Sequence, residues 1–128
     1  MKIKTSQNLV LEALKDIKTI SAEEGLKLFN NKECNLIDIR DEVELQKNGR
    51  IENSYHISRG LLEFSIHPDS AYFKNNAIDI AKEMVLFCAA GGRSALAVKT
   101  LKEMGFEKVS HIEGGFGSMQ NSGFKVKK

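Results

Sequence analysis

The chain has 128 residues, which is enough for one domain with a proper hydrophobic core. Its 19 lysines and arginines nearly balance its 17 aspartates and glutamates, so the charge gives no case for a nucleic-acid partner. Two cysteines without a C-x-x-C pair argue against a disulfide framework and fit a reducing compartment, and the three dispersed histidines do not resemble a metal site. No apolar run is long enough for a membrane span or has the form of a signal-peptide core, and we therefore expect a cytoplasmic protein that binds neither nucleic acid nor a membrane.

Short predicted strands alternate with predicted helices along the chain. Apolar residues at helical spacing or capping signals predict helices over 6–17, from Ser21 to about Asn30, from Asp41 onward, and over 61–66, 70–73 and 95–104. Short apolar or β-branched runs predict strands at 19–20, 36–40, 54–57, 83–87 and 109–112. This alternation predicts an α/β fold with a parallel sheet, helices on both faces and right-handed crossovers.

The first predicted helix precedes the alternating pattern. Its apolar face carries Leu9, Val10, Ala13, Leu14 and Ile17, and its polar face is not notably basic. We interpret residues 1–18 as a helical extension packed on a single domain that covers 19–128. The basic tail from Lys125 to Lys128 is interpreted as a solvated end.

A cysteine stands at the junction between the predicted strand 83–87 and the helix that follows. Free N–H groups at a helix N-terminus attract negative charge, and adjacent glycines let the backbone curl so that successive N–H groups face one centre. Arg93 adds a fixed positive charge. These features favour a thiolate, and they make Cys88 a candidate nucleophile. The seven residues are Cys88, Ala89, Ala90, Gly91, Gly92, Arg93 and Ser94.

This loop resembles the active-site loop of the rhodanese (sulfurtransferase) domain family, which has the pattern Cys-x-x-Gly-x-Arg-Ser after a strand. Three further segments resemble motifs of that family in the same order, and together they cover about residues 19–124. They are Leu36–Arg40 with Glu44, Gly49–Ile51 with His56–Gly60, and Glu113–Phe116. The chain departs from the family at Ser58, where proline is usual, and at Gly117 and Ser118, where a further aromatic residue is common.

The resemblance implies a rhodanese-like three-layer fold around a mostly parallel five-stranded sheet. It also implies sulfur transfer without a metal or cofactor: Cys88 takes a sulfur atom from a donor such as thiosulfate, forms a persulfide, and passes it to cyanide or a thiol, including a protein thiol. We expect the N–H groups of Ala89 to Ser94 to stabilise the anions and Arg93 to fix the loop. Ser94 either donates a hydrogen bond to the sulfur or caps the helix. Arg59 either lines the pocket or is solvated.

Two other functions remain open on the sequence alone. A cysteine phosphatase or arsenate reductase also uses a Cys-to-Arg loop, but only four residues separate Cys88 from Arg93, whereas the phosphatase pattern has five. A persulfide carrier or binding module in a sulfur relay would have the same loop. Asp38 and Arg40 are interpreted mainly as support for the site, and Cys34 as a half-buried filler rather than a second, resolving thiol. We expect a monomer or a weak dimer.

Overall fold

A parallel sheet of five strands forms the centre of the computed structural model, which describes residues 2–128. The spatial order is β1-β6-β5-β2-β4, and every pair of neighbours is parallel. The strands are β1 (Lys18–Ile20), β2 (Cys34–Asp38), β4 (Tyr55–His56), β5 (Glu83–Phe87) and β6 (Val109–Ile112). Strand β5 is therefore the central strand, with β6 and β2 on either side, although β5 and β6 come from the second half of the chain.

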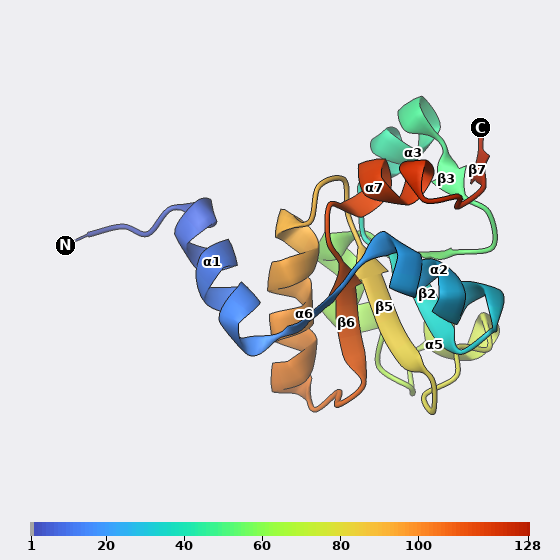
Figure 1. The fold of residues 1–128 in the computed structure, drawn as a ribbon. Helices are drawn as coiled ribbons and strands as arrows, with labels where there is room; N and C mark the ends of the chain where they lie inside the picture. The colour runs from blue at the N-terminus through green and yellow to red at the C-terminus, as the bar shows by residue number, and fades with distance from the viewer. Residues whose placement is uncertain (1) are drawn as a thin grey trace.

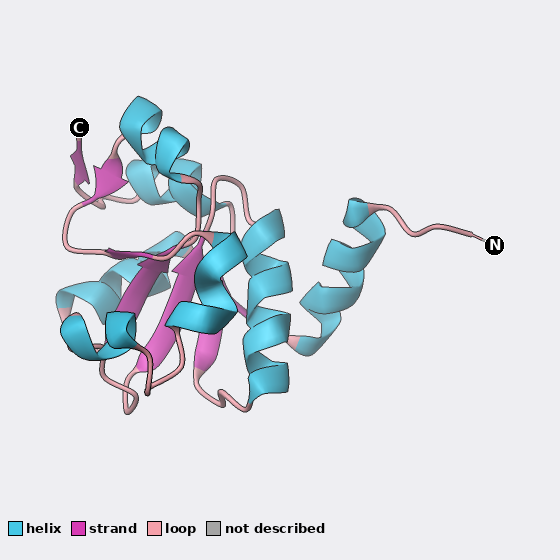
Figure 2. Cartoon of the chain, turned by 180° about the vertical axis from the view of Figure 1, so that it is seen from behind, coloured by secondary structure: helices cyan, strands magenta, loops and turns pink. Residues whose placement is uncertain are grey.

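Helices cover both faces of this sheet, as Figures 1 and 2 show from opposite sides. They are α1 (Ser6–Asp16), α2 (Ala22–Asn30), α3 (Glu42–Asn48), η1 (Arg59–Leu61), α4 (Leu62–Ser65), α5 (Ala71–Asn75), α6 (Gly92–Met104) and α7 (Gly115–Asn121). Helix α1 lies beyond α6 at the side of the molecule (Figure 1). The predicted fold, a parallel five-stranded sheet between two layers of helices, is confirmed.

Alternation along β5 divides the hydrophobic core into two parts. Met84, Leu86 and Cys88 belong to the core beneath α4, α5 and α6, whereas Val85 and Phe87 belong to the core beneath α2 and α7. All five side chains are at most 1% exposed. This pattern is typical of a central parallel strand covered on both faces. It also means that Cys88 continues an inward-facing row of core side chains.

The sequence-based boundaries agree best where a buried strand or a cap is strong. Strands 83–87 and 109–112 match β5 and β6, and Ser21 caps α2 by accepting a hydrogen bond from the N–H of Glu24 at 3.1 Å. Gly105 ends α6 with φ +107°, directly after the predicted helix 95–104. Strand β2 begins at Cys34 and ends at Asp38, two residues earlier than predicted, because the ladder with β5 ends there.

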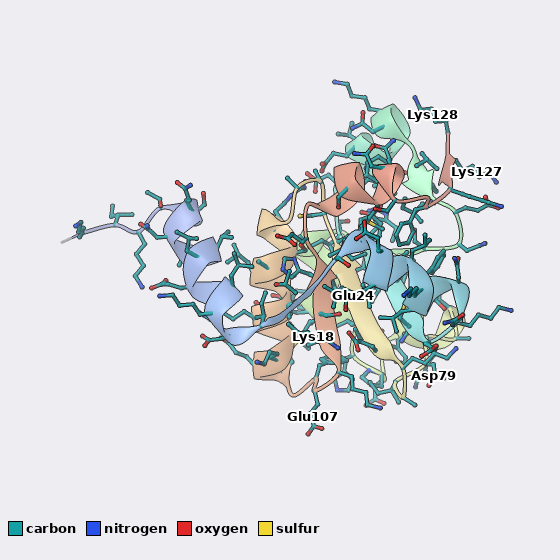
Figure 3. All side chains as sticks on the ribbon, in the orientation of Figure 1. Lys18, Glu24, Asp79, Glu107, Lys127 and Lys128 are labelled. Carbon is teal, nitrogen blue, oxygen red and sulfur yellow. The ribbon has the colours of Figure 1, made fainter. Side chains whose placement is uncertain are left out.

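The last residues of the chain differ from the prediction. Strand β7 (Val126–Lys127) pairs antiparallel with β3 (Arg50–Ile51), so the tail is not simply a solvated end. Figure 3 labels Lys127 and Lys128 beside this small second sheet. Neither of these two-residue strands was predicted, because the pairing joins segments that are distant in the sequence and each strand is too short for a periodic pattern.

Candidate active site

The sulfur atom of Cys88 lies inside the curl of the loop that joins β5 to α6. Its Sγ accepts hydrogen bonds from the N–H of Gly91 at 3.1 Å and from the N–H of Ser94 at 3.4 Å. The residue is only 1% exposed. The first turn of α6 adds the positive end of its dipole at the same place, so the surroundings of this sulfur favour negative charge.

A left-handed glycine makes this curl. Gly91 is the N-cap residue of α6 and has φ +107°, a region in which a side chain would be strained. The two alanines before it form the exposed tip of the loop. Helix α6 therefore begins at Gly92, three residues before the predicted start. The contacts with a substrate anion that we predicted for the loop from Ala89 to Ser94 stay predictions.

Arg93 is held by Glu44, the first-turn residue of α3. The two guanidinium nitrogens donate to the two carboxylate oxygens, each at 2.8 Å. Glu44 also accepts from the N–H of Asp41 at 2.9 Å, so one side chain both caps α3 and anchors the loop. Hydrogen bonding from Arg93 lowers the pKa of Glu44 from 4.5 to about 2, although burial acts in the opposite direction, and the same pairing raises the pKa of Arg93.

Glu44→Gln is expected to loosen the loop, because an amide offers this arginine a single uncharged acceptor. We expect roughly a tenfold loss of activity at Cys88 and a stability loss of about 1 kcal/mol, since both side chains are partly exposed. The folded-state pKa of Glu44 is lowered, so its contribution is complete above pH 4.5 and is lost as the pH falls through about 2.

Urea unfolding of both proteins between pH 7 and pH 2 checks this prediction. The stability difference between them should shrink as the pH falls below 4.5. Glu12→Gln, which weakens an exposed ion pair with Lys4 on α1, is the matched control. A difference that stays constant over this range would contradict the proposed role of the ion pair.

A buried ion pair supports the site from beneath. The guanidinium of Arg40 donates to both carboxylate oxygens of Asp38 at 2.7–3.2 Å and to the carbonyl of Gly49 at 3.0 Å. It also lies 4.0 Å from the centroid of the Phe116 ring. Asp38 and Arg40 are 0% and 1% exposed. Arg40 thus joins the end of β2 to the turn after α3 and to α7. This agrees with the interpretation of Asp38 and Arg40 as residues that support the site.

Helix α7 closes directly on the backbone of Cys88. The N–H of Phe116 donates to the carbonyl of Cys88 at 2.9 Å. Gly115 has φ +58°, and a Cβ atom there would stand 2.4 Å from that carbonyl oxygen. Gly114 also has a positive φ, so the two glycines turn the chain tightly at this point. The sequence did not predict that Gly115 begins a helix packed against the loop.

Ser94 does not cap α6 with its side chain; it faces the sulfur instead. Its Oγ lies 3.5 Å from Cys88 Sγ, 3.3 Å from the carbonyl of Gly91 and 2.8 Å from Nδ1 of His111. On the far side of the ring, Nε2 of His111 lies 3.0 Å from the hydroxyl of Thr19. The Ser94 hydroxyl therefore contacts the sulfur, and its donation of a hydrogen bond to that atom stays a prediction.

Arg59 and Cys34 lie away from this centre. Arg59 donates to Glu63 at 2.8 Å and to the Thr100 hydroxyl at 3.3 Å, along the side of α6; its role in binding stays a prediction. Cys34 pairs in register with Glu83, five residues before Cys88. The two thiols are therefore roughly 16 Å apart along the strands, far beyond disulfide reach. Burial raises the pKa of Cys34 to about 12, which fits an unreactive filler.

A cavity lies at the opposite end of the sheet from Cys88. Its lining includes Pro68, Met84, Phe106 and Glu107, and Figure 3 labels Glu107 at this lower end. It therefore has no part in the chemistry of the loop. In the described part of the chain, no helix is both long and apolar enough to cross a membrane.

Sequence reasoning missed three partners of the loop. It placed Glu44 in a family motif but did not pair it with Arg93, it counted His111 only as not belonging to a metal cluster, and it gave Thr19 no role. Each lies far from the loop in sequence, so spacing alone carried no signal. One hint was available. His111 lies in the strand Val109–Ile112, which is buried throughout, and a buried histidine needs hydrogen-bond partners.

The parallel sheet, the Cys-to-Arg loop and the supporting glycine turn define a known class of domain. The family described as rhodanese-like domain matches residues 21–122, and the chain belongs to this family. The domain boundary that we predicted at residue 18 stays a prediction.

Two proteins that are similar in sequence have names that refer to sulfur transfer. YtwF of Bacillus subtilis, provisionally named a sulfurtransferase, is 34% identical over 102 residues, which are 80% of this chain and 86% of that protein. A mouse thiosulfate sulfurtransferase/rhodanese-like domain-containing protein 3 is 28% identical over 103 residues. Those residues are 77% of this chain and 66% of the mouse protein, so the chain spans just under two thirds of its length.

Two solved structures cover nearly the whole fold. A protein of unknown function from Rhodopseudomonas palustris, described as a possible tyrosine phosphatase, superposes with a TM-score of 0.83 at 34% identity, over 99% of this chain and 97% of that one. The homodimeric polysulfide-sulfur transferase of Wolinella succinogenes superposes with a TM-score of 0.73 at 34% identity, over 93% and 84% of the two chains.

Proposed function

We propose that this protein is a sulfurtransferase that works through a persulfide on Cys88. The single observation that carries the proposal is the position of the sulfur: Cys88 Sγ accepts hydrogen bonds from two backbone N–H groups at the N-terminus of α6. Hydrogen bonds of this kind stabilise a sulfur anion without any metal or cofactor. Relatives named for sulfur transfer, including one named a polysulfide-sulfur transferase, support the same chemistry.

The proposed reaction has two halves. The Cys88 thiolate attacks the outer sulfur of thiosulfate or a related donor; an S–S bond forms at Cys88, the S–S bond of the donor breaks, and sulfite leaves with the bonding electrons. A thiolate or cyanide then attacks the terminal sulfur of the persulfide and restores the Cys88 thiolate. The N–H groups that hold Sγ stabilise the charge at both stages.

The loop predicts only modest activity with thiosulfate. Ala89 and Ala90 at its exposed tip carry no charge, and Arg93 is engaged by Glu44. An anionic donor therefore relies on backbone N–H groups and on the general positive potential of the loop. A low Michaelis constant for thiosulfate would contradict this expectation.

Intact-protein mass after incubation with thiosulfate tests the proposal. We expect one added sulfur atom on the wild type, its loss on treatment with cyanide, and no addition to Cys88→Ser. Rapid alkylation of Cys88 with no added sulfur from thiosulfate or polysulfide would overturn the sulfurtransferase proposal. Formation of the persulfide without turnover to cyanide or small thiols would instead indicate a carrier that delivers sulfur to a partner protein.

A phosphatase is the rival function, given the description of the Rhodopseudomonas protein. The geometry here argues against it. Only four residues separate Cys88 from Arg93, and the guanidinium uses two nitrogens on Glu44 rather than facing the loop centre. A tetrahedral oxyanion would need those donors. Hydrolysis of p-nitrophenyl phosphate that disappears in Cys88→Ser would reverse this preference.

A further inference from the structure

A chain of hydrogen bonds connects the buried sulfur to the surface. It runs from Cys88 Sγ to Ser94 Oγ at 3.5 Å, from Ser94 Oγ to His111 Nδ1 at 2.8 Å, and from His111 Nε2 to Thr19 Oγ1 at 3.0 Å. Cys88, Ser94 and His111 are 1%, 0% and 2% exposed, whereas Thr19 is exposed on the edge strand β1. Figure 3 labels its neighbour Lys18 on this outer strand. Nothing in the mechanism above uses His111 or Thr19.

The direction of these hydrogen bonds depends on the state of the sulfur. The Ser94 hydroxyl has one proton to donate, and it has three neighbours: the sulfur, His111 Nδ1 and the carbonyl of Gly91. It can donate to a thiolate while keeping its contact with the ring only if Nδ1 carries the proton of the imidazole. Nε2 is then bare and accepts from the Thr19 hydroxyl.

The surroundings of His111 keep the ring neutral. The strands on either side place Thr19 and Leu86 in register with it, and Ser94 faces it from α6; none of these carries a charge. Burial alone lowers the pKa of His111. A neutral imidazole carries one ring N–H proton, on either Nδ1 or Nε2. A change of tautomer therefore reverses the direction of both hydrogen bonds, to Ser94 and to Thr19, without charging the ring.

We propose that His111 is a positioning residue, which turns the Ser94 hydroxyl toward the Cys88 thiolate and takes its own orientation from Thr19. This inference rests on the proposed function of Cys88 as the nucleophile. The proton balance closes. The S–H proton passes to Ser94 Oγ, the Ser94 proton to Nδ1, the Nε2 proton to Thr19 Oγ1, and the Thr19 proton to water. Every donor in the chain then points toward the sulfur, and one proton has left the protein.

The pH dependence of alkylation at Cys88 tests this proposal and needs no sulfur donor. The measurement uses iodoacetamide and intact mass between pH 5 and pH 10, in a Cys34→Ser background that leaves Cys88 as the single thiol. His111→Leu removes the donor to Ser94, and Thr19→Val removes the outer hydroxyl at an exposed site where folding is safe. Thr19→Ser keeps the hydroxyl, and His67→Gln changes an exposed histidine outside the chain of hydrogen bonds.

In His111→Leu we expect the midpoint of the alkylation profile to move up by about one pH unit, which is roughly a tenfold lower rate at pH values well below the midpoint, with the plateau rate at high pH unchanged. Thr19→Val should move it in the same direction by less, and His111→Asn, whose amide can still donate to Ser94, should restore part of the loss. Thr19→Ser and His67→Gln should match the parent.

Three outcomes would overturn the proposal in whole or part. An unchanged midpoint in folded His111→Leu overturns it entirely. A shift of the midpoint in His111→Leu without one in Thr19→Val removes Thr19 from the hydrogen-bond chain. If His111→Leu does not fold, an unchanged midpoint in Thr19→Val overturns the proposal. Because alkylation reports only the thiolate, a protein that shows these shifts but forms no persulfide would contradict sulfur transfer and leave the hydrogen-bond chain intact.

Discussion

Asp38→Ala is expected to lower the free energy of unfolding by about 3–5 kcal/mol, because it leaves the guanidinium of Arg40 buried without its carboxylate. Domains of this size have only about 5–15 kcal/mol in total. The melting temperature should therefore fall by roughly 10–20 °C. Activity should also fall, because Arg40 contacts the Phe116 ring and so helps to hold α7 on the loop.

Thermal and urea unfolding of two further variants makes this prediction specific. Glu12→Ala removes the acid of an exposed ion pair with Lys4 and should leave the melting temperature unchanged. Asp38→Leu combined with Arg40→Met removes both buried charges and should recover much of the loss. A melting temperature for Asp38→Ala close to that of the wild type would show that the buried pair is not what supports the site.

Gly115→Ala is expected to reduce activity at Cys88 by about a hundredfold, because the new methyl group would displace the backbone that positions the sulfur. The ideal Cβ lies 2.4 Å from the Cys88 carbonyl oxygen and 2.7 Å from the Ala89 carbonyl carbon. Both are main-chain atoms that cannot turn aside, and φ of +58° adds strain for any side chain. Rates of Cys88 alkylation and persulfide formation measure the effect.

Gly117→Ala is the matched control for this substitution. It lies in the same helix, its Cβ would meet open space, and alanine favours a helix more than glycine does. It should keep full activity and equal or higher stability. Normal activity in folded Gly115→Ala would mean that the loop tolerates a shift of its backbone and that the close packing of α7 is not needed to position the Cys88 sulfur.

Much of the fold was predictable from local signals. The apolar run 84–87 needed no partner to be recognised as a buried strand, and Gly105 marked the end of α6 because a left-handed C-terminal residue favours glycine. The same holds for Cys88 at a strand–helix junction. Each of these features is determined by residues that are adjacent in the sequence, so it can be recognised without knowing the fold.

Contacts between distant segments were not predictable in this way. The pairing of Arg93 with Glu44 joins two helices that are 49 residues apart, and the contact of His111 with Thr19 spans 92 residues. The sequence supplied the arginine, the carboxylate and the histidine but not the sheet order that brings them together. The register of β1 on β6, with Thr19 opposite His111, becomes known only from the assembled sheet.

The order of the sheet also bears on how the chain is made. A ribosome releases β1 and β2 first, yet β6 and β5 separate them in the finished sheet. Until residues 83–112 emerge, β1 has no neighbour and β2 has only the short β4, so their unpaired edges are open to pairing with other chains. A nick in the connector near residues 76–82 would leave two fragments whose strands interleave, and each fragment would need the other to complete its sheet.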